Sequence, residues 1–118
     1  MAKVINKIAV PAMGETANDL ISSSFGRCLF MIIYEVESES FTAFVNPGAS
    51  LPDGSGLKAS EIIIRNKADS LLTIELGRKA YSVLTKEHIN VHLLKSSGAV
   101  KSAINKFIKK WKHDIAGK

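Results

Sequence analysis

The sequence predicts an α/β protein whose five-stranded mixed sheet is flanked by helices, with elements in the order β-β-β-α-β-α-β-α. Short runs rich in β-branched residues recur along the chain, and in its second half they alternate with segments whose apolar residues have helical spacing. Apolar residues make up 46% of the 118 residues and charged residues 23%, which fits one globular domain spanning 1–118. Strands separated by helices should pair in parallel, whereas the first three should form an antiparallel meander.

The first half of the chain contains three predicted strands. Their expected ranges are Ile5–Ala12, Cys28–Val36 and Phe41–Asn46. The polar segment 13–27 between the first two is too long for a hairpin turn, and a loop rich in glycine and proline follows at 47–56. We therefore expect the second and third strands to form a hairpin, with a long loop on either side of it.

The second half alternates helices and strands. Helices are predicted at 57–67 and 77–87, each followed by a strand, at 68–74 and 89–94. A last helix should follow the Ser96-Ser97-Gly98 cap, with an apolar stripe that packs on the sheet. Its expected members are Val100, Ile104, Phe107, Ile108 and Trp111.

Positive charge is concentrated in the basic C-terminal helix and tail, about 98–118. The net charge is +5, and the segment from Lys95 to Lys118 contains seven lysines and one acidic residue, Asp114. This segment could bind an acidic protein partner, or it could be a solvated helix face. Nucleic acid is the weaker alternative, because no RNA-binding aromatic signature accompanies the lysines.

Several absences bear on where the protein acts. No apolar run approaches the roughly 20 residues that span a bilayer, which argues against a membrane partner. The first residues contain no apolar signal-peptide core, and the single cysteine, Cys28, suits a reducing compartment. We therefore expect a cytoplasmic location.

The predicted topology brings four loops, 13–27, 47–56, 75–78 and 95–98, to one edge of the sheet. Ligands of open α/β sheets bind outside the carboxyl ends of strands. Glycines there would let the backbone approach an anion, assisted by the N-termini of all three helices. Each glycine alone could simply mark a turn. Those in the four loops are Gly14, Gly26, Gly48, Gly54, Gly56, Gly77 and Gly98.

Two motifs carry a resemblance to a known family. The first strand contains Lys-Ile-Ala-Val-Pro at 7–11, and Ser-Phe-Gly-Arg at 24–27 opens the second. This order resembles the dinitrogenase iron–molybdenum cofactor biosynthesis family, which includes NifX-like proteins and the carboxyl-terminal domain of the NifB type, over roughly 7 to 110. Where that family typically has His-Phe-Gly-Arg, this chain has Ser24 in place of the histidine.

The resemblance implies a ribonuclease-H-like fold and a function connected with nitrogen fixation. It implies a binding or carrier protein for an iron–sulfur or iron–molybdenum cofactor or its precursor, with cofactor-assembly or dinitrogenase proteins as partners. Cys28 is the one candidate metal ligand, since thiolates suit iron–sulfur clusters. The candidate cofactor-binding residues are Gly14, Ser24, Phe25, Gly26, Arg27, Cys28, Gly54, Gly56 and Gly77.

Other interpretations stay open for single residues. Cys28 could be a small buried residue, and Arg27 could donate hydrogen bonds to loop carbonyls instead of neutralising a cluster. Arg78 and Lys79 could be cluster-binding cations or solvated charges.

No catalytic residue is predicted. A ribonuclease-H-type nuclease needs several carboxylates around divalent metal ions, and the first strand contains none. The serines at 22–24 lack a placed histidine base. The alternative to a carrier is a regulatory or interaction module that keeps the fold without binding a cluster.

Overall fold

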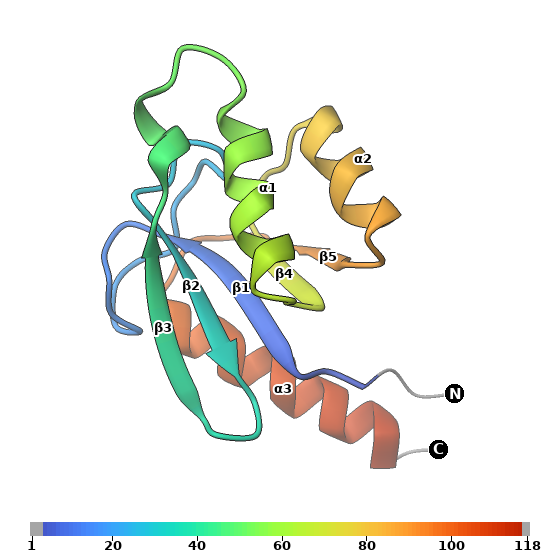
Figure 1. The fold of residues 1–118 in the computed structure, drawn as a ribbon. Coiled ribbons are helices and arrows are strands. Elements are labelled where there is room, and N and C mark those ends of the chain that lie inside the picture. Colours follow the sequence, from blue (N-terminus) through green and yellow to red (C-terminus); the bar gives the residue numbers. More distant parts are fainter. Residues whose placement is uncertain (1–3, 117–118) are drawn as a thin grey trace.

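The computed structural model describes residues 4–116 and has the expected order of elements (Figure 1). The first three and last two residues of the predicted domain, including Lys118, lie outside the described residues. A short 3-10 helix, η1, occupies part of the segment expected to be a loop. The elements are β1 (Lys7–Ala12), β2 (Phe30–Glu35), β3 (Ser40–Val45), η1 (Pro47–Ser50), α1 (Ser55–Arg65), β4 (Ser70–Thr73), α2 (Arg78–Lys86), β5 (Asn90–Leu93) and α3 (Val100–Ala116).

The five strands form one mixed sheet in the order β3-β2-β1-β4-β5. The pairs β1–β2 and β2–β3 are antiparallel, whereas β1–β4 and β4–β5 are parallel. The carboxyl ends of β1, β3, β4 and β5 therefore meet at one edge, which we call the loop edge. This confirms the predicted mixed α/β sheet, while the ribonuclease-H-like label stays a prediction.

Helices cover both faces of the sheet, and the alternation of strand side chains divides the core in two (Figure 1). Ala9, Met31 and Leu71 point toward α1 and α2, whereas Val10 and Ile32 point toward α3. In α3, two residues of the predicted stripe, at 100 and 104, are fully buried, and those at 107, 108 and 111 are partly buried. The predicted stripe is confirmed.

Among residues 4–116, no helix combines the length and apolar composition that crossing a lipid bilayer requires.

Candidate functional site

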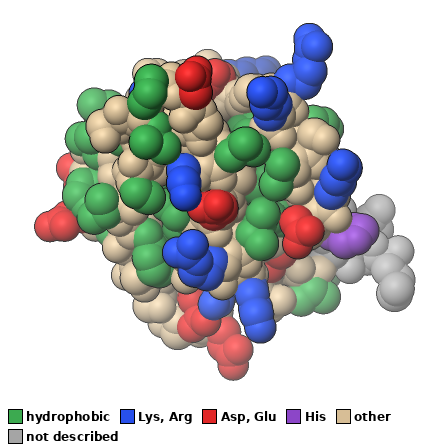
Figure 2. Space-filling view, turned by 45° about the horizontal axis from the view of Figure 1, so that its top comes forward, with side chains coloured by type: hydrophobic (Ala, Val, Ile, Leu, Met, Phe, Trp, Pro, Cys, Tyr) green, Lys and Arg blue, Asp and Glu red, His purple; other side chains and the backbone are tan. Residues whose placement is uncertain are grey.

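A cavity of about 610 Å³ lies at the loop edge on the α1–α2 side of the sheet; we call it the loop-edge cavity. Figure 2 looks toward this edge and shows Lys and Arg side chains among hydrophobic ones, with acidic side chains between them. The cavity brings together most of the predicted site residues, from three separate loops. Its lining consists of Ser24, Phe25, Gly26, Arg27, Asp53, Gly54, Ser55, Gly56, Leu57, Glu75, Gly77, Arg78, Lys79 and Ala80.

The N-termini of two helices contribute to this lining. α1 follows Gly54 and α2 follows Gly77, and neither helix has a side-chain cap or an acidic residue in its first turn. The first N–H groups of a helix have no partner within the helix and carry the positive end of its dipole. Two such ends at one cavity favour an anionic ligand.

The N-terminus of α3 is used differently. The Val100 N–H donates to the Asp19 carbonyl at 3.0 Å, and the Lys101 N–H donates to the Ala17 carbonyl at 2.8 Å. The expectation that all three helix N-termini serve the site is therefore wrong for α3. The loop between β1 and β2 is responsible, because its first half folds over the start of α3 and only its second half reaches the loop-edge cavity.

Gly14 belongs to that first half and does not line the loop-edge cavity. A Cβ atom at Gly14 would lie 2.3 Å from the Asp19 carboxyl carbon. The Asp19 carboxylate accepts hydrogen bonds from both the N–H and the hydroxyl of Thr16, and these hydrogen bonds hold the pKa of Asp19 below its ordinary value. The absence of a side chain at Gly14 thus permits a tight turn.

The turn at Ser24–Arg27 is held by one hydrogen bond within the turn and one to the segment that follows β4. The Ser24 hydroxyl accepts from the Arg27 N–H at 3.2 Å, so Ser24 stabilises the turn. The Phe25 N–H donates to Glu75 Oε1 at 3.0 Å, and the Phe25 ring is only 1% exposed. Phe25 therefore anchors the turn in the core while its backbone lines the cavity.

The glycines of the loop-edge cavity differ in what they permit. A Cβ atom at Gly26 would lie 2.7 Å from Ser55 Oγ and 2.9 Å from the Gly56 nitrogen, so only glycine lets the turn contact the start of α1. Gly54 has φ of 77°, a left-handed conformation that favours glycine.

At position 77, neither the backbone conformation nor the neighbouring atoms require a glycine. Its φ of −71° is ordinary, and a Cβ atom there would meet nothing within 4 Å. At Gly56 an added Cβ would make an ordinary 3.5 Å contact with Ala80. Of the two, Gly77 lies beside open space through which a ligand can approach the N-terminus of α2, whereas Gly56 packs against α2.

Arg27 holds the loop that follows η1. Its guanidinium donates to the carbonyls of Leu51, Ala49 (3.4 Å) and Pro52 (3.1 Å). These three contacts agree with the interpretation that Arg27 donates hydrogen bonds to loop carbonyls. Arg78 and Lys79 are exposed in the first turn of α2, where they place positive charge beside the cavity.

Cys28, expected at the loop edge, lies in the core instead. Its side chain is 1% exposed and does not line the cavity, and the Asn46 side-chain nitrogen lies 3.5 Å from its sulfur. Burial raises the pKa of the Cys28 thiol to about 11, so the thiol is protonated at neutral pH. Because the thiolate is the metal-binding form, the role of Cys28 as a ligand stays a prediction that requires this region to open.

Sequence reasoning missed two residues that build the site. Asn46 is 3% exposed and donates to the carbonyls of Gly26 and Cys28, both at 2.9 Å, while its oxygen accepts from the Gly48 N–H at 3.1 Å. Glu75 is the second of these residues, because its place after β4 puts it at the loop edge, where it accepts from the Phe25 N–H. Within residues 4–116, no three His, Cys, Asp or Glu side chains form a metal-binding group.

Comparison with known proteins identifies the class. The model of the dinitrogenase iron-molybdenum cofactor family matches residues 6–110, so this chain belongs to that family. No functionally curated protein matches the chain significantly.

Two solved structures share the fold. The apo form of the orange protein from Desulfovibrio gigas has a TM-score of 0.85 and 25% identity, covering 93% of this chain and 92% of its own. A Thermotoga protein described as a NifB protein of the DUF35 family has a TM-score of 0.78 and 26% identity, covering 89% of both chains. Both similarities extend over nearly the whole domain.

Proposed function

We propose that this chain is a non-catalytic binding or carrier protein for an iron–sulfur or iron–molybdenum cofactor or its precursor, held in the loop-edge cavity. The observation that carries the proposal is the meeting of two uncapped helix N-termini, with Arg78 and Lys79, at one cavity. Membership of the dinitrogenase iron-molybdenum cofactor family supports a metal–sulfur cluster as the anion. Cofactor-assembly or dinitrogenase proteins are the proposed partners, and a cytoplasmic location stays a prediction.

The residues present suit a preassembled cluster. An ordinary iron–sulfur cluster is held by four cysteine thiolates, whereas this chain has one cysteine and its thiol is buried and protonated. The cavity offers backbone N–H groups and the cations of Arg78 and Lys79 instead. Its other charged groups are Arg27, which is engaged with loop carbonyls, Glu75, which accepts from the Phe25 N–H, and Asp53. The cargo would therefore be held as an anion, by hydrogen bonds from the starts of α1 and α2 and by charge attraction.

The glycines and Arg27 have separate roles in this proposal. Gly77 leaves space beside the N–H groups that would contact the cargo, whereas Gly56 lets α1 pack closely against Ala80 of α2. Gly26 and Arg27 act as positioning residues, because one fits the turn against α1 and the other fixes the carbonyls of the neighbouring loop. Glu75 holds the Phe25 N–H and so fixes the turn from the side of β4.

A regulatory or interaction module that keeps the fold without a cluster is the second candidate. It is favoured by two observations, the replacement of the family's histidine by Ser24 and the burial of the Cys28 thiol. Both reduce the number of side chains that could ligate a metal.

The test is an anaerobic titration with the isolated iron–molybdenum cofactor precursor, read by visible absorption and by metal analysis of the repurified protein. We expect stoichiometric binding by the wild type. Neutralising both cations with Arg78→Gln and Lys79→Gln should weaken binding at least about tenfold, and Cys28→Ala should still bind.

The matched control neutralises Arg65 and Lys86, which lie in the last turns of α1 and α2 and away from the loop edge. This double variant removes the same net charge, and its affinity for the precursor should stay within about twofold of the wild-type value. Absence of binding by the folded wild type would favour the interaction module. Equal losses in both double variants would show that total charge, and not the cavity, attracts the cargo.

A further inference from the structure

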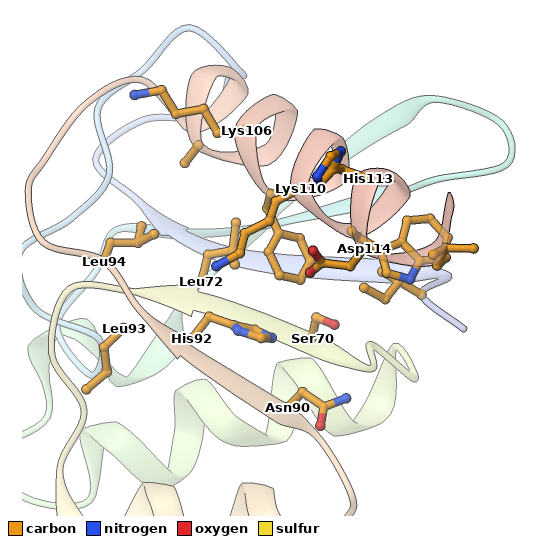
Figure 3. A pocket seen from close by; sticks show the side chains of 15 residues that line it. Ser70, Leu72, Asn90, His92, Leu93, Leu94, Lys106, Lys110, His113 and Asp114 are labelled. Carbon is orange, nitrogen blue, oxygen red and sulfur yellow. The ribbon is translucent and has the colours of Figure 1, made fainter. Parts of the chain in front are cut away.

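A second hollow, a groove of about 830 Å³, lies on the opposite face of the sheet between α3 and the strands β4 and β5; we call it the α3–β5 groove. Figure 3 shows Ser70, Leu72, Asn90 and His92 along its strand side and α3 above them. Lys106 lies toward the Leu94 end of the groove, and Asp114 lies toward the other end. The groove shares no lining residue with the loop-edge cavity.

The walls of the groove combine positive charge from two lysines with apolar surface, and the Asp114 carboxylate lies toward the end of the groove away from Leu94. Lys106 and Lys110 are exposed, and Lys110 extends across the groove toward the strands (Figure 3). Phe107 and Trp111, from the same helix, are partly buried and present aromatic surface to it. An occupant that presents both acidic and apolar groups on one face would match both features.

The strand that borders the groove is the end of the sheet. β5 pairs only with β4 among the described strands. The N–H groups of Asn90 and Leu94 donate to carbonyls of the β4 side, at 2.9 Å and 2.8 Å, so the alternate peptide groups of Val91 and Leu93 face outward. Leu93 is also 65% exposed. Such an edge is a template for pairing with an added strand.

We propose that the α3–β5 groove binds an extended acidic segment of a partner protein, which adds to the sheet beside β5. Backbone hydrogen bonds to residues 91 and 93 set its register. Alternate side chains then enter the groove, because successive residues of a strand point to opposite faces. Among these groove-facing side chains, which occupy every second position, acidic ones contact Lys106 and Lys110, and apolar ones contact Phe107 and Trp111. This docking is independent of the cargo proposed for the loop-edge cavity.

The probe is a short synthetic peptide in which every second residue is in turn glutamate and leucine or valine, with threonine between them, so that one strand face carries both kinds of side chain. It is labelled for fluorescence anisotropy and titrated with the full chain. Two matched peptides accompany it, one with glutamine in place of glutamate and one with N-methyl groups on alternate amides. The first removes the charge, and the second removes strand pairing. We expect both to bind at least about tenfold more weakly than the probe.

The protein variants separate the groove from general charge. Lys106→Glu with Lys110→Glu reverses two lysines that line the groove, whereas Lys109→Glu with Lys112→Glu makes the same change on the same helix outside it. We expect the first pair to lose at least about tenfold in affinity and the second to stay within about threefold. Equal losses in both pairs would overturn the proposal, as would equal binding of the glutamine peptide.

A second measurement locates the strand. Peptide binding should slow hydrogen exchange at the Val91 and Leu93 amides, and the amides of β3, the other edge strand, provide the internal control. Unchanged exchange at Val91 and Leu93 while the peptide is bound would overturn strand addition. Tighter binding of a single-stranded oligonucleotide than of the peptide, lost in the Lys106/Lys110 variant, would replace the acidic segment with nucleic acid.

Discussion

The loop-edge cavity and the α3–β5 groove lie on opposite faces of one sheet and are built from different parts of the chain. In the first, backbone N–H groups, glycines and a buried asparagine define the space. In the second, exposed lysines and partly buried aromatic rings of a single helix define it.

This difference determines what a mutation can do. The loop-edge cavity depends on loops that buried hydrogen bonds and close backbone contacts hold in place, so changes there should lower the free energy of unfolding. Changes to exposed side chains of α3 should alter binding and leave stability nearly unchanged.

The largest loss of stability is expected from a change at Asn46, whose side chain bonds two loops that border the loop-edge cavity. Asn46→Ala leaves the Gly26 and Cys28 carbonyls and the Gly48 N–H without their partner, and should lower the free energy of unfolding by about 3 kcal/mol. Asn66→Ala is the matched control, because the Asn66 side chain makes one hydrogen bond, to Ile62, and should cost about 1 kcal/mol. Urea unfolding measures both, and equal losses would contradict the special position of Asn46.

The buried thiol should make stability fall at high pH. The pKa of Cys28 is about 11 in the folded protein, against an ordinary value of about 9. Between these values the unfolded chain loses the thiol proton and the folded chain keeps it, so stability is fully present below pH 9 and falls as pH rises. The total loss should be about 2–3 kcal/mol.

Other groups also titrate in that range, so the comparison is with Cys28→Ala. The stability advantage of the wild type over this variant, measured by urea unfolding at several pH values, should shrink between pH 9 and 11. Parallel pH profiles would mean that the thiol is more accessible than its position in the core indicates.

Two glycines of the loop-edge cavity should differ in their effect on stability. Gly26→Ala should cost about 1–3 kcal/mol, because its Cβ would lie 2.9 Å from the Gly56 nitrogen. Gly77→Ala should change stability by no more than about 0.5 kcal/mol, since its backbone is ordinary and its surroundings are open. If Gly77→Ala unfolds as readily as Gly26→Ala, the open space at Gly77 is structural and not reserved for a ligand.

The smallest effect is expected in the α3–β5 groove. Lys106→Glu with Lys110→Glu should change the free energy of unfolding by less than about 1 kcal/mol, because both side chains are exposed. Thermal unfolding beside the wild type measures this. A larger loss of stability would show that the two lysines support the packing of α3. It would contradict the view that changes in the groove, unlike changes at the cavity, leave stability nearly unchanged.

The order and type of the elements could be predicted from hydrophobic periodicity, because strands with period two and helices with a stripe leave a local pattern. The short helix η1 was missed, since Pro47 and Gly48 are typical of loops as well. The convergence of the segments around Gly26, Gly54 and Gly77 followed from topology alone, and the cavity lining contains all three.

Which loop residues face the loop-edge cavity could not be predicted. Gly14 and Gly26 belong to the same loop, yet one turns against Asp19 and the other against the start of α1. Cys28 is adjacent to a turn residue of the cavity and is nevertheless buried. Sequence neighbours in a loop have no fixed period, so their directions depend on long-range partners such as Asn46 and Glu75.

Local patterns in the chain were enough to predict the mixed sheet, the edge at which the loops meet, the apolar stripe of α3 and the concentration of lysines there. Each of these follows from local composition and from the chirality of strand connections. Tertiary structure alone decided that the N-terminus of α3 is closed while those of α1 and α2 have no side-chain cap, and that α3 leaves a groove beside β5. These outcomes depend on how segments distant in sequence pack, and packing leaves no periodic signal in the chain.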